Sequence, residues 1–228
     1  MKHNFQLVAG HLALDFANTL DWRFDPERRV DLIPTYESFL EFAMQSAVIS
    51  LKDVETLLTR TSKRESFRTL RRAVDLRETL DRLFRSIAVG SSPSRSCLAK
   101  FNHFLADSRI PHFIIRRGSE FVCAPVDLSI TSDGPLWPIV DAAASLLTSP
   151  DRVRIRECGE PTCRWLFLDN SKNQSRQWCS MKICGNRAKV QRFRARHPLL
   201  RSPEPWLSLC LVMPLLMVAS LSEYGGGV

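Results

Sequence analysis

The sequence predicts an α+β protein: a mainly helical amino-terminal domain with a small antiparallel β element, followed by a small cysteine-rich module. Three observations lead to this prediction. Apolar residues recur at helical spacing through most of residues 1–150, two β-prone runs flank a Gly-Ser turn, and four of the seven cysteines fall within residues 151–197. Hydrophobic residues make up 44% of the 228 residues and charged residues 25%, which is typical of a globular protein that buries a sizeable core.

Apolar spacing predicts a series of helices in the amino-terminal domain. The stretch from Phe5 to Arg23 is expected to form a short strand or turn that leads into a helix. Further along the chain, helices are expected over residues 35–48, 52–60, 67–89 and 98–106. The helix over 67–89 has the longest apolar stripe, and Arg and Glu side chains fill its other face.

Past residue 106 the pattern changes from helical to strand-like. Two β-prone runs, 112–117 and 120–124, flank Gly118-Ser119 and predict an antiparallel hairpin. A further helix is expected over residues 136–147, because its apolar run stops at a Ser-Pro pair. The amino-terminal domain is therefore predicted to combine several helices with one small antiparallel element.

The predicted domain boundary, Pro150–Asp151, coincides with a change in charge. Residues 1–150 hold 19 basic and 18 acidic side chains, residues 151–197 hold 12 and 4, and residues 198–228 hold one and two. The excess positive charge of the chain, +8 in total, is thus concentrated in the middle block. A compact block of this charge density is typical of a protein that binds a phosphate backbone.

The cysteines indicate a reducing compartment and a metal site. Seven is an odd number, and the opening MKHNFQLVAG lacks the pattern of a secretory signal, so we expect a cytoplasmic protein with reduced thiols. Four cysteines form two pairs of equal spacing, Cys158-x4-Cys163 and Cys179-x4-Cys184, separated by fifteen residues. Two such pairs can surround one tetrahedral Zn²⁺ with four thiolates. We therefore predict one structural zinc ion, with no open position for catalysis.

The residues around the cysteines predict a knuckle, a hairpin and a helix. Residues 164–169 and 176–179 are expected to form the two strands of the hairpin. A helix is expected from Cys184 to Arg196, with Cys184 at its start. One face of this helix is expected to pack against the module, and it consists of Ile183, Asn186, Val190 and Phe193.

Two segments resemble known families. The run CGEPTCRWLFLDNSKNQSRQWCSMKICGNRAKVQRFRAR is similar to the CGNR zinc finger, whose name-giving motif is Cys184-Gly185-Asn186-Arg187 here. The stretch LVAGHLALDFANTLDWR resembles the start of the ABATE domain of stress-induced bacterial transcription regulators. Together the resemblances cover about residues 5–197. They imply a zinc-binding, DNA-binding module behind a regulatory domain, with the four cysteines as ligands and no catalytic residues.

Basic side chains of the module are the predicted nucleic-acid contacts. We expect phosphate contacts from Arg176, Lys182, Arg187, Lys189, Arg192 and Arg196. Arg187 has a second interpretation, because it can brace the knuckle through backbone carbonyls instead of binding DNA. The family commonly has paired arginines before Trp178, whereas this chain has Arg176-Gln177, which removes one phosphate contact without affecting the metal site.

Polar residues near the amino terminus form a candidate effector pocket. They are His11, Asp15, Asn18 and Thr19, which lie close together in the sequence. The alternative is that Asp15 and Asn18 satisfy backbone groups near a helix start. In the leading hypothesis, the amino-terminal domain senses a small-molecule effector or mediates assembly, including a homodimer, while the module binds DNA.

Three alternatives remain open. The module can serve as a zinc-dependent protein-interaction surface, or it can bind RNA through exposed aromatic side chains. Trp165, Phe167 and Trp178 are the candidates for such a platform, although these residues are expected first as the core of the zinc site. An enzyme is not expected, because no nucleophile with a base, phosphate loop or carboxylate pair is recognisable.

The apolar extension, residues 198–228, is predicted to be an extra helix or poorly ordered. Its uncharged run of 16 residues, 206–221, is shorter than the ~20 needed to span a bilayer, so no membrane contact is expected.

Overall fold

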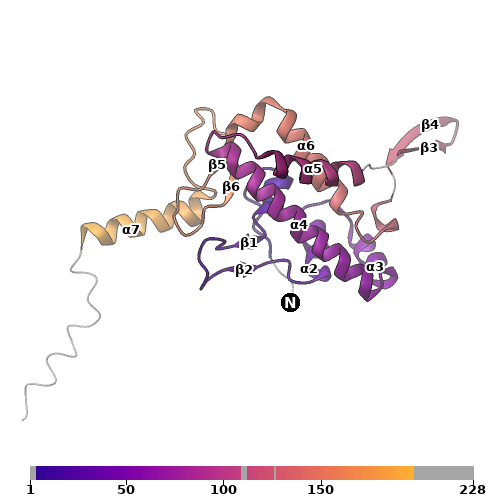
Figure 1. Ribbon diagram of the computed structural model, residues 1–228, viewed down its shortest axis with the longest axis horizontal. Coiled ribbons are helices and arrows are strands. Elements are labelled where there is room, and N and C mark those ends of the chain that lie inside the picture. The colour runs from indigo at the N-terminus through magenta and orange to yellow at the C-terminus, as the bar shows by residue number, and fades with distance from the viewer. Residues whose placement is uncertain (1–3, 109–111, 126, 198–228) are drawn as a thin grey trace, which may run out of the picture. The chain divides into compact units, whose positions relative to one another are not determined.

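The computed structural model describes residues 4–108, 112–125 and 127–197. Residues 1–185 form one compact unit, and a second unit starts at Asn186, of which the structure describes one helix. The helices of the first unit are α1 (Leu12–Ala17), α2 (Tyr36–Gln45), α3 (Leu51–Arg60), α4 (Lys63–Ala88), α5 (Arg95–Asp107) and α6 (Leu136–Thr148) (Figure 1). The second unit contains α7 (Asn186–Arg196). Each predicted helix is confirmed within a few residues of its expected ends.

The strands of the described residues form three antiparallel pairs. They are β1 (Leu20–Asp21) with β2 (Val30–Asp31), β3 (His112–Arg117) with β4 (Glu120–Pro125), and β5 (Ile155–Glu157) with β6 (Leu166–Leu168). The β3–β4 pair is the predicted hairpin, and Gly118 supplies the positive φ of +63° that its turn requires. The predicted α+β class, mainly helical with small antiparallel elements, is confirmed.

Three consecutive helices begin with a capping box, in which two side chains satisfy each other's backbone N–H groups. The pairs are Thr35 and Ser38 for α2, Ser50 and Asp53 for α3, and Ser62 and Glu65 for α4. The cap also explains why α4 starts at Lys63, four residues before its predicted start. Its first turn is polar, so the apolar stripe does not mark the helix start.

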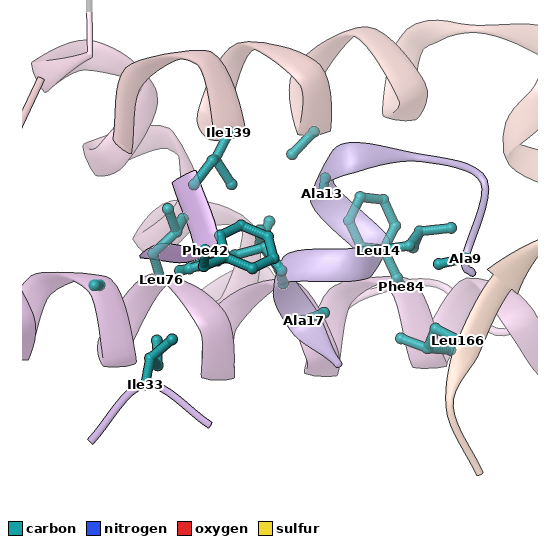
Figure 2. Packing of buried hydrophobic residues seen from close by; sticks show 14 of the residues in the cluster. Ala9, Ala13, Leu14, Ala17, Ile33, Phe42, Leu76, Phe84, Ile139 and Leu166 are labelled. Atoms are coloured by element: carbon teal, nitrogen blue, oxygen red, sulfur yellow. The ribbon is translucent and has the colours of Figure 1, made fainter. Parts of the chain in front are cut away.

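The core is built around α4, the longest helix. Leu76, Leu80 and Phe84 of this helix are fully buried and contact the core that α1 and α2 complete. Aromatic rings join these helices, since the ring centroids of Phe16 and Phe42 lie 5.4 Å apart. Figure 2 shows this packing, with α6 contributing Ile139. The buried hydrophobic residues of α1, α2, α4 and α6 therefore belong to one continuous core.

The strand β6 belongs to the same core. Leu166 and Phe167 are fully buried, and β6 packs against α1 and α4. Figure 2 shows Leu166 beside Phe84 and Ala9. The predicted boundary at Pro150–Asp151 thus lies inside a compact unit, and the segment that follows it completes the core of the helices before it.

The predicted pairing of residues 164–169 with 176–179 is wrong. β6 pairs instead with β5, in the register Ile155 to Leu168, and residues 176–179 form no strand. The reason is that the backbone N–H of Arg176 donates to Asp169 Oδ2 at 3.0 Å, so this segment is held by a side chain. The knuckle between the first two cysteines is therefore the connection of the β5–β6 hairpin.

Within the part of the chain that the structure describes, no helix is long and apolar enough to cross a membrane. The extension at residues 198–228, for which we predict an extra helix or a poorly ordered tail, lies outside the described residues.

Candidate metal centre

The structure brings the four predicted ligands together. Cys158 follows β5, Cys163 precedes β6, Cys179 lies in the next loop, and Cys184 lies in a π-helical turn, Met181–Gly185, directly before α7. All four are buried and unlinked by disulfides, and their Sγ atoms all lie within 4.8 Å of one another. The Cys163–Cys179 and Cys179–Cys184 distances between Sγ atoms are both 3.6 Å.

These distances fit a tetrahedral zinc site. With Zn–S bonds of about 2.3 Å, a regular tetrahedron has S–S edges of about 3.8 Å, close to the separations in the cluster. Hydrogen bonds from Cys163 and the other thiols lower the pKa of Cys158, while the thiolate of Cys158 raises the pKa of Cys163 and of Cys179. All four cysteines can be thiolates together only when a cation such as Zn²⁺ lies between them, because neighbouring negative sulfurs disfavour one another. Four sulfur ligands complete the shell, so the ion has a structural role.

Backbone groups and one glycine shape the centre. The N–H of Cys179 donates to Cys158 Sγ at 3.4 Å, and the N–H of Gly159 donates to the carbonyl of Gln177 at 2.9 Å, which ties the two cysteine pairs together. A Cβ atom at Gly185 would lie 2.3 Å from Met181 Sδ and 3.3 Å from Trp178 Cδ1. The glycine of the Cys-Gly-Asn-Arg motif is thus explained by close packing over the last ligand.

Asn18 joins the metal module to the helical part. Its Nδ2 donates to the carbonyl of Leu166 at 2.9 Å, and the N–H of Leu166 donates to its Oδ1 at 3.0 Å. The side chain is buried, and its amide forms with Leu166 the two hydrogen bonds that a neighbouring strand would otherwise form. We call this pair of hydrogen bonds the Asn18 bracket. The indole N–H of Trp165 adds a bond of 3.0 Å to Asp21 Oδ1. The local sequence around Asn18 predicts a place in an effector pocket or at a helix start and gives no sign of this connection.

Ion pairs also connect the metal module to α4. Arg85 of α4 contacts Glu157 of β5 at 2.7 Å and Asp81 at 2.7 Å, and Asp81 and the other acidic partners raise its pKa against the opposing effect of burial. Arg164 also pairs with Glu157. The centre of the Phe24 ring lies close to both guanidinium groups, at 4.7 Å from Arg85 and 4.0 Å from Arg164. The metal module is thus connected to α4 by charge as well as by apolar packing.

Arg176 makes protein contacts. Its guanidinium donates to the carbonyl of Trp178 at 2.9 Å and to that of Val8 at 3.1 Å, and it also donates to the carbonyl of Cys179. The same group lies 4.6 Å from the centre of the Phe167 ring. Its hydrogen-bonding groups are therefore directed at the metal loop and the amino-terminal segment, although the sequence predicted a phosphate contact.

The other predicted phosphate contacts lie in or next to α7. Lys182, Lys189, Arg192 and Arg196 are exposed, and Arg187 is half-buried. The predicted packing face of this helix is wrong, because Ile183, Val190 and Phe193 are exposed and Ala188 is the buried residue of the helix.

The aromatic platform proposed for RNA is also not available. Trp165 and Phe167 are buried, and Trp178 is half-buried, so they belong to the interior around the metal centre. Recognition of single-stranded RNA by stacking needs exposed rings. The rings of this module therefore stabilise the fold.

The candidate effector residues have partners within the protein. His11 caps α1, its Nδ1 accepting from the N–H of Ala13, and Thr19 donates from Oγ1 to the carbonyl of Phe16 at 2.8 Å. Asp15 Oδ1 accepts from the N–H of Ala9 at 2.9 Å. The contact of Asp15 is thus that of the alternative interpretation, a backbone group near a helix start, whereas Asn18 binds the backbone of Leu166 in β6. The effector pocket stays a prediction.

Asp15 provides a pH-dependent test. Burial raises its pKa to about 6, against the lowering effect of the N–H groups of Ala9 and Val8. From pH 4 to 6 the folded state therefore binds more protons than the unfolded state, and the contribution of Asp15 to stability is lost as the pH rises through 6. We expect Asp15→Asn to gain about 1 kcal/mol relative to the wild type between pH 5 and pH 7.5, as measured by urea unfolding of the zinc-loaded proteins. If the free energies of unfolding of the wild type and of Asp15→Asn differed by the same amount at every pH, the raised pKa of Asp15 would be contradicted.

Comparison with protein families agrees with the two resemblances. The family model described as "Putative stress-induced transcription regulator", ABATE, matches residues 10–150, and the model described as "CGNR zinc finger" matches residues 154–197. No curated protein matches the chain. The finger model spans all four buried cysteines, so the cluster is the site of one structural zinc ion. The chain therefore belongs to the ABATE family of transcription regulators and carries a CGNR zinc finger after its ABATE domain.

Proposed function

We propose that this protein regulates transcription by binding DNA through α7. The observation that carries the proposal is the charge of this helix, because five of its eleven residues are cationic and none is acidic. The cations are Arg187, Lys189, Arg192, Arg194 and Arg196. A helix of this composition cannot neutralise its own charge, and a phosphate backbone offers the matching anions at high density.

The stability of α7 also favours a polyanionic partner. Isolated helices of fewer than about 12 residues are marginal in water, and helices gain most of their stability from a buried apolar face. Of the residues in α7, Ala188 is buried, while Val190 and Phe193 are exposed. In the sequence the helix starts two residues after Cys184, so zinc coordination holds the chain at its amino-terminal end. Phosphate contacts would stabilise the remaining length.

For the helical part we propose a regulatory role, by sensing a small-molecule ligand or by mediating assembly such as a homodimer, with no catalytic activity. The Asn18 bracket supports this role, since a ligand that moves α1 would also move β6. Addition of a ligand should then shift the affinity for DNA, and no shift across a broad metabolite panel would contradict sensing. A cytoplasmic location follows from this function.

The experiment is a salt titration of binding to a mixed pool of duplex DNA, with single-stranded RNA run in parallel. Each phosphate contact contributes about −0.9 to the slope of log K against log salt. We expect the combined variant Lys189→Gln/Arg192→Gln/Arg196→Gln to reduce the magnitude of the slope by about two to three. The control is Arg29→Gln/Arg82→Gln/Arg95→Gln, which removes three exposed cations outside α7 and should leave the slope unchanged.

The outcomes separate the alternatives. A reduced slope for the α7 variant and an unchanged slope for the control would support DNA binding by α7. Stronger binding to the RNA pool would favour an RNA-binding protein. No binding of the wild type to either pool at low salt would contradict the proposal and favour a zinc-dependent protein-interaction module.

A further inference from the structure

A second basic surface lies on α4, far from α7 in the sequence. Exposed cations occur at Arg64, Arg68 and Arg71, which are spaced i, i+4 and i+7 and therefore share one face of the helix. We call these three residues the α4 strip. Arg60 and Lys63, at the junction between α3 and α4, are also exposed and lie next to it in the sequence. The balance of 19 basic and 18 acidic residues over residues 1–150 hides this local excess.

Six of the seven arginines of α4 fall into two groups with different surroundings, and the seventh, Arg82, is exposed and donates from Nε to the carbonyl of Glu78 at 3.1 Å. In the buried or half-buried group, Arg72 pairs with Asp107 at 3.2 Å, Arg77 with Asp31 at 2.7 Å and Arg85 with Asp81 at 2.7 Å. Among the described residues, by contrast, no carboxylate lies within 4.0 Å of the guanidinium nitrogens of the α4 strip. The paired arginines serve the fold, whereas the strip has no such role.

The nearest acidic residue in the sequence offsets only part of the positive charge of the strip. Glu65 is the single carboxylate among residues 60–72, and it belongs to the capping box of α4, where it accepts bonds from the N–H and the hydroxyl of Ser62. These bonds, and to a smaller extent the charge of Arg68, lower the pKa of Glu65, so its carboxylate stays ionised and offsets one of the neighbouring cations. The surface from Arg60 to Arg71 thus carries five exposed cations against one carboxylate.

The position of the cations on the helix is unfavourable for stability. Lys63 and Arg64 occupy the first turn of α4, where the exposed N–H groups already create partial positive charge. Positive side chains belong at the other end of a helix on electrostatic grounds. Neither salt bridges nor the helix dipole therefore explain this surface.

We propose that the α4 strip is a second contact surface for the phosphate backbone of DNA, in addition to α7. The strip spans about 10 Å of helix, which matches about three nucleotides of one strand at 3.4 Å each. Arg68 and Arg71 also line a surface groove with Phe67, whose ring is exposed and lies 5.9 Å from the guanidinium of Arg71. Two carboxylates, Asp75 and Glu78, line the same groove, and they form ion pairs with Lys100 and Arg23. The contacts are to phosphates, so they add affinity without sequence preference. The inference rests on the proposed DNA-binding function.

The test uses the full zinc-loaded chain with Arg64→Gln/Arg68→Gln/Arg71→Gln. We expect the salt slope on duplex DNA to fall in magnitude by about two to three, and the affinity to fall to the same extent for every DNA sequence. The control is again Arg29→Gln/Arg82→Gln/Arg95→Gln, which removes the same number of exposed charges. Because the substituted arginines support no ion pair and Arg64 opposes the helix dipole, the melting temperature of the strip variant should equal or exceed that of the wild type.

Each outcome decides the inference. The inference would be supported if the strip variant folds normally and its slope of log K against log salt falls in magnitude, while the slope of the control variant equals that of the wild type. A slope equal to that of the control would overturn it, while a reduced slope in the α7 variant would leave the proposed function intact. Equal losses in the strip variant and the control would also overturn it, because net charge alone would then explain the effect. Failure of the wild type to bind DNA would overturn both proposals.

Discussion

Replacement of Cys163 by serine is expected to release the zinc ion and to destabilise the protein well beyond residues 151–197. Coordination of a structural zinc supplies about 10–16 kcal/mol in isolated fingers at neutral pH, and a hydroxyl cannot replace a thiolate in the shell. In this protein Cys163 lies three residues before Leu166, the first residue of β6, which is part of the core with α1 and α4. Loss of the metal should therefore loosen these helices as well as the finger.

Two measurements check this prediction. Zinc content by mass spectrometry should fall from one ion per chain to near zero, and hydrogen exchange should speed up in the finger, in α1 and in the carboxy-terminal half of α4. The control is Cys97→Ser, since Cys97 lies in α5 and its Sγ is 3.6 Å from the carbonyl of Thr79, outside the cluster. Stoichiometric zinc in the Cys163 variant would contradict the ligand assignment. Increased exchange confined to residues 151–197 would contradict the shared core.

Replacement of Asn18 by alanine is expected to lower the free energy of unfolding by about 3 kcal/mol. The change leaves the N–H and the carbonyl of Leu166 without the amide that satisfies them, in a place that is closed to water. Each unsatisfied buried group costs about 1–3 kcal/mol. Zinc should also be lost more readily to a chelator, because the bracket positions the strand that follows Cys163.

Asn102→Ala is the matched control for Asn18→Ala. Asn102 is exposed on α5, where alanine is the better helix former, so the same substitution should change stability by less than about 1 kcal/mol. Urea unfolding and competition with a zinc chelator measure the two effects. Equal stabilities for the two variants would show that the amide bracket does not stabilise the protein, and unchanged zinc retention in the Asn18 variant would show that β6 does not support the site.

Local features of the sequence predicted most of the elements. Apolar spacing located the helices, and the four cysteines located the metal centre, because ligand spacing and helical periodicity are properties of short segments. The start of α4 at Lys63 was missed since its capping box, Ser62 with Glu65, carries no apolar signal. The family resemblance added the identity of both domains, which composition and spacing alone do not contain.

Long-range relations were not predictable from local patterns. Asn18 and Leu166 are 148 residues apart, and nothing around either residue indicates their contact. The three-residue strand β5 is too short to show alternation, so the pairing of β6 was assigned to a nearer segment. Arg176 was counted with the other cations by charge, whereas its contacts with backbone carbonyls depend on the folded loop.

The place of Leu166 in the core also affects biosynthesis. A ribosome makes the chain from the amino terminus, so α1 and α4 emerge long before the strand that covers Ala9 and Phe84. Domains generally fold as units during synthesis, and incomplete ones expose apolar surface. Until residue 166 has left the exit tunnel and the cysteines have acquired their ion, the nascent chain has an uncovered apolar site. Zinc supply thus becomes a condition for maturation, and chains made during zinc shortage would be substrates for chaperones and proteases.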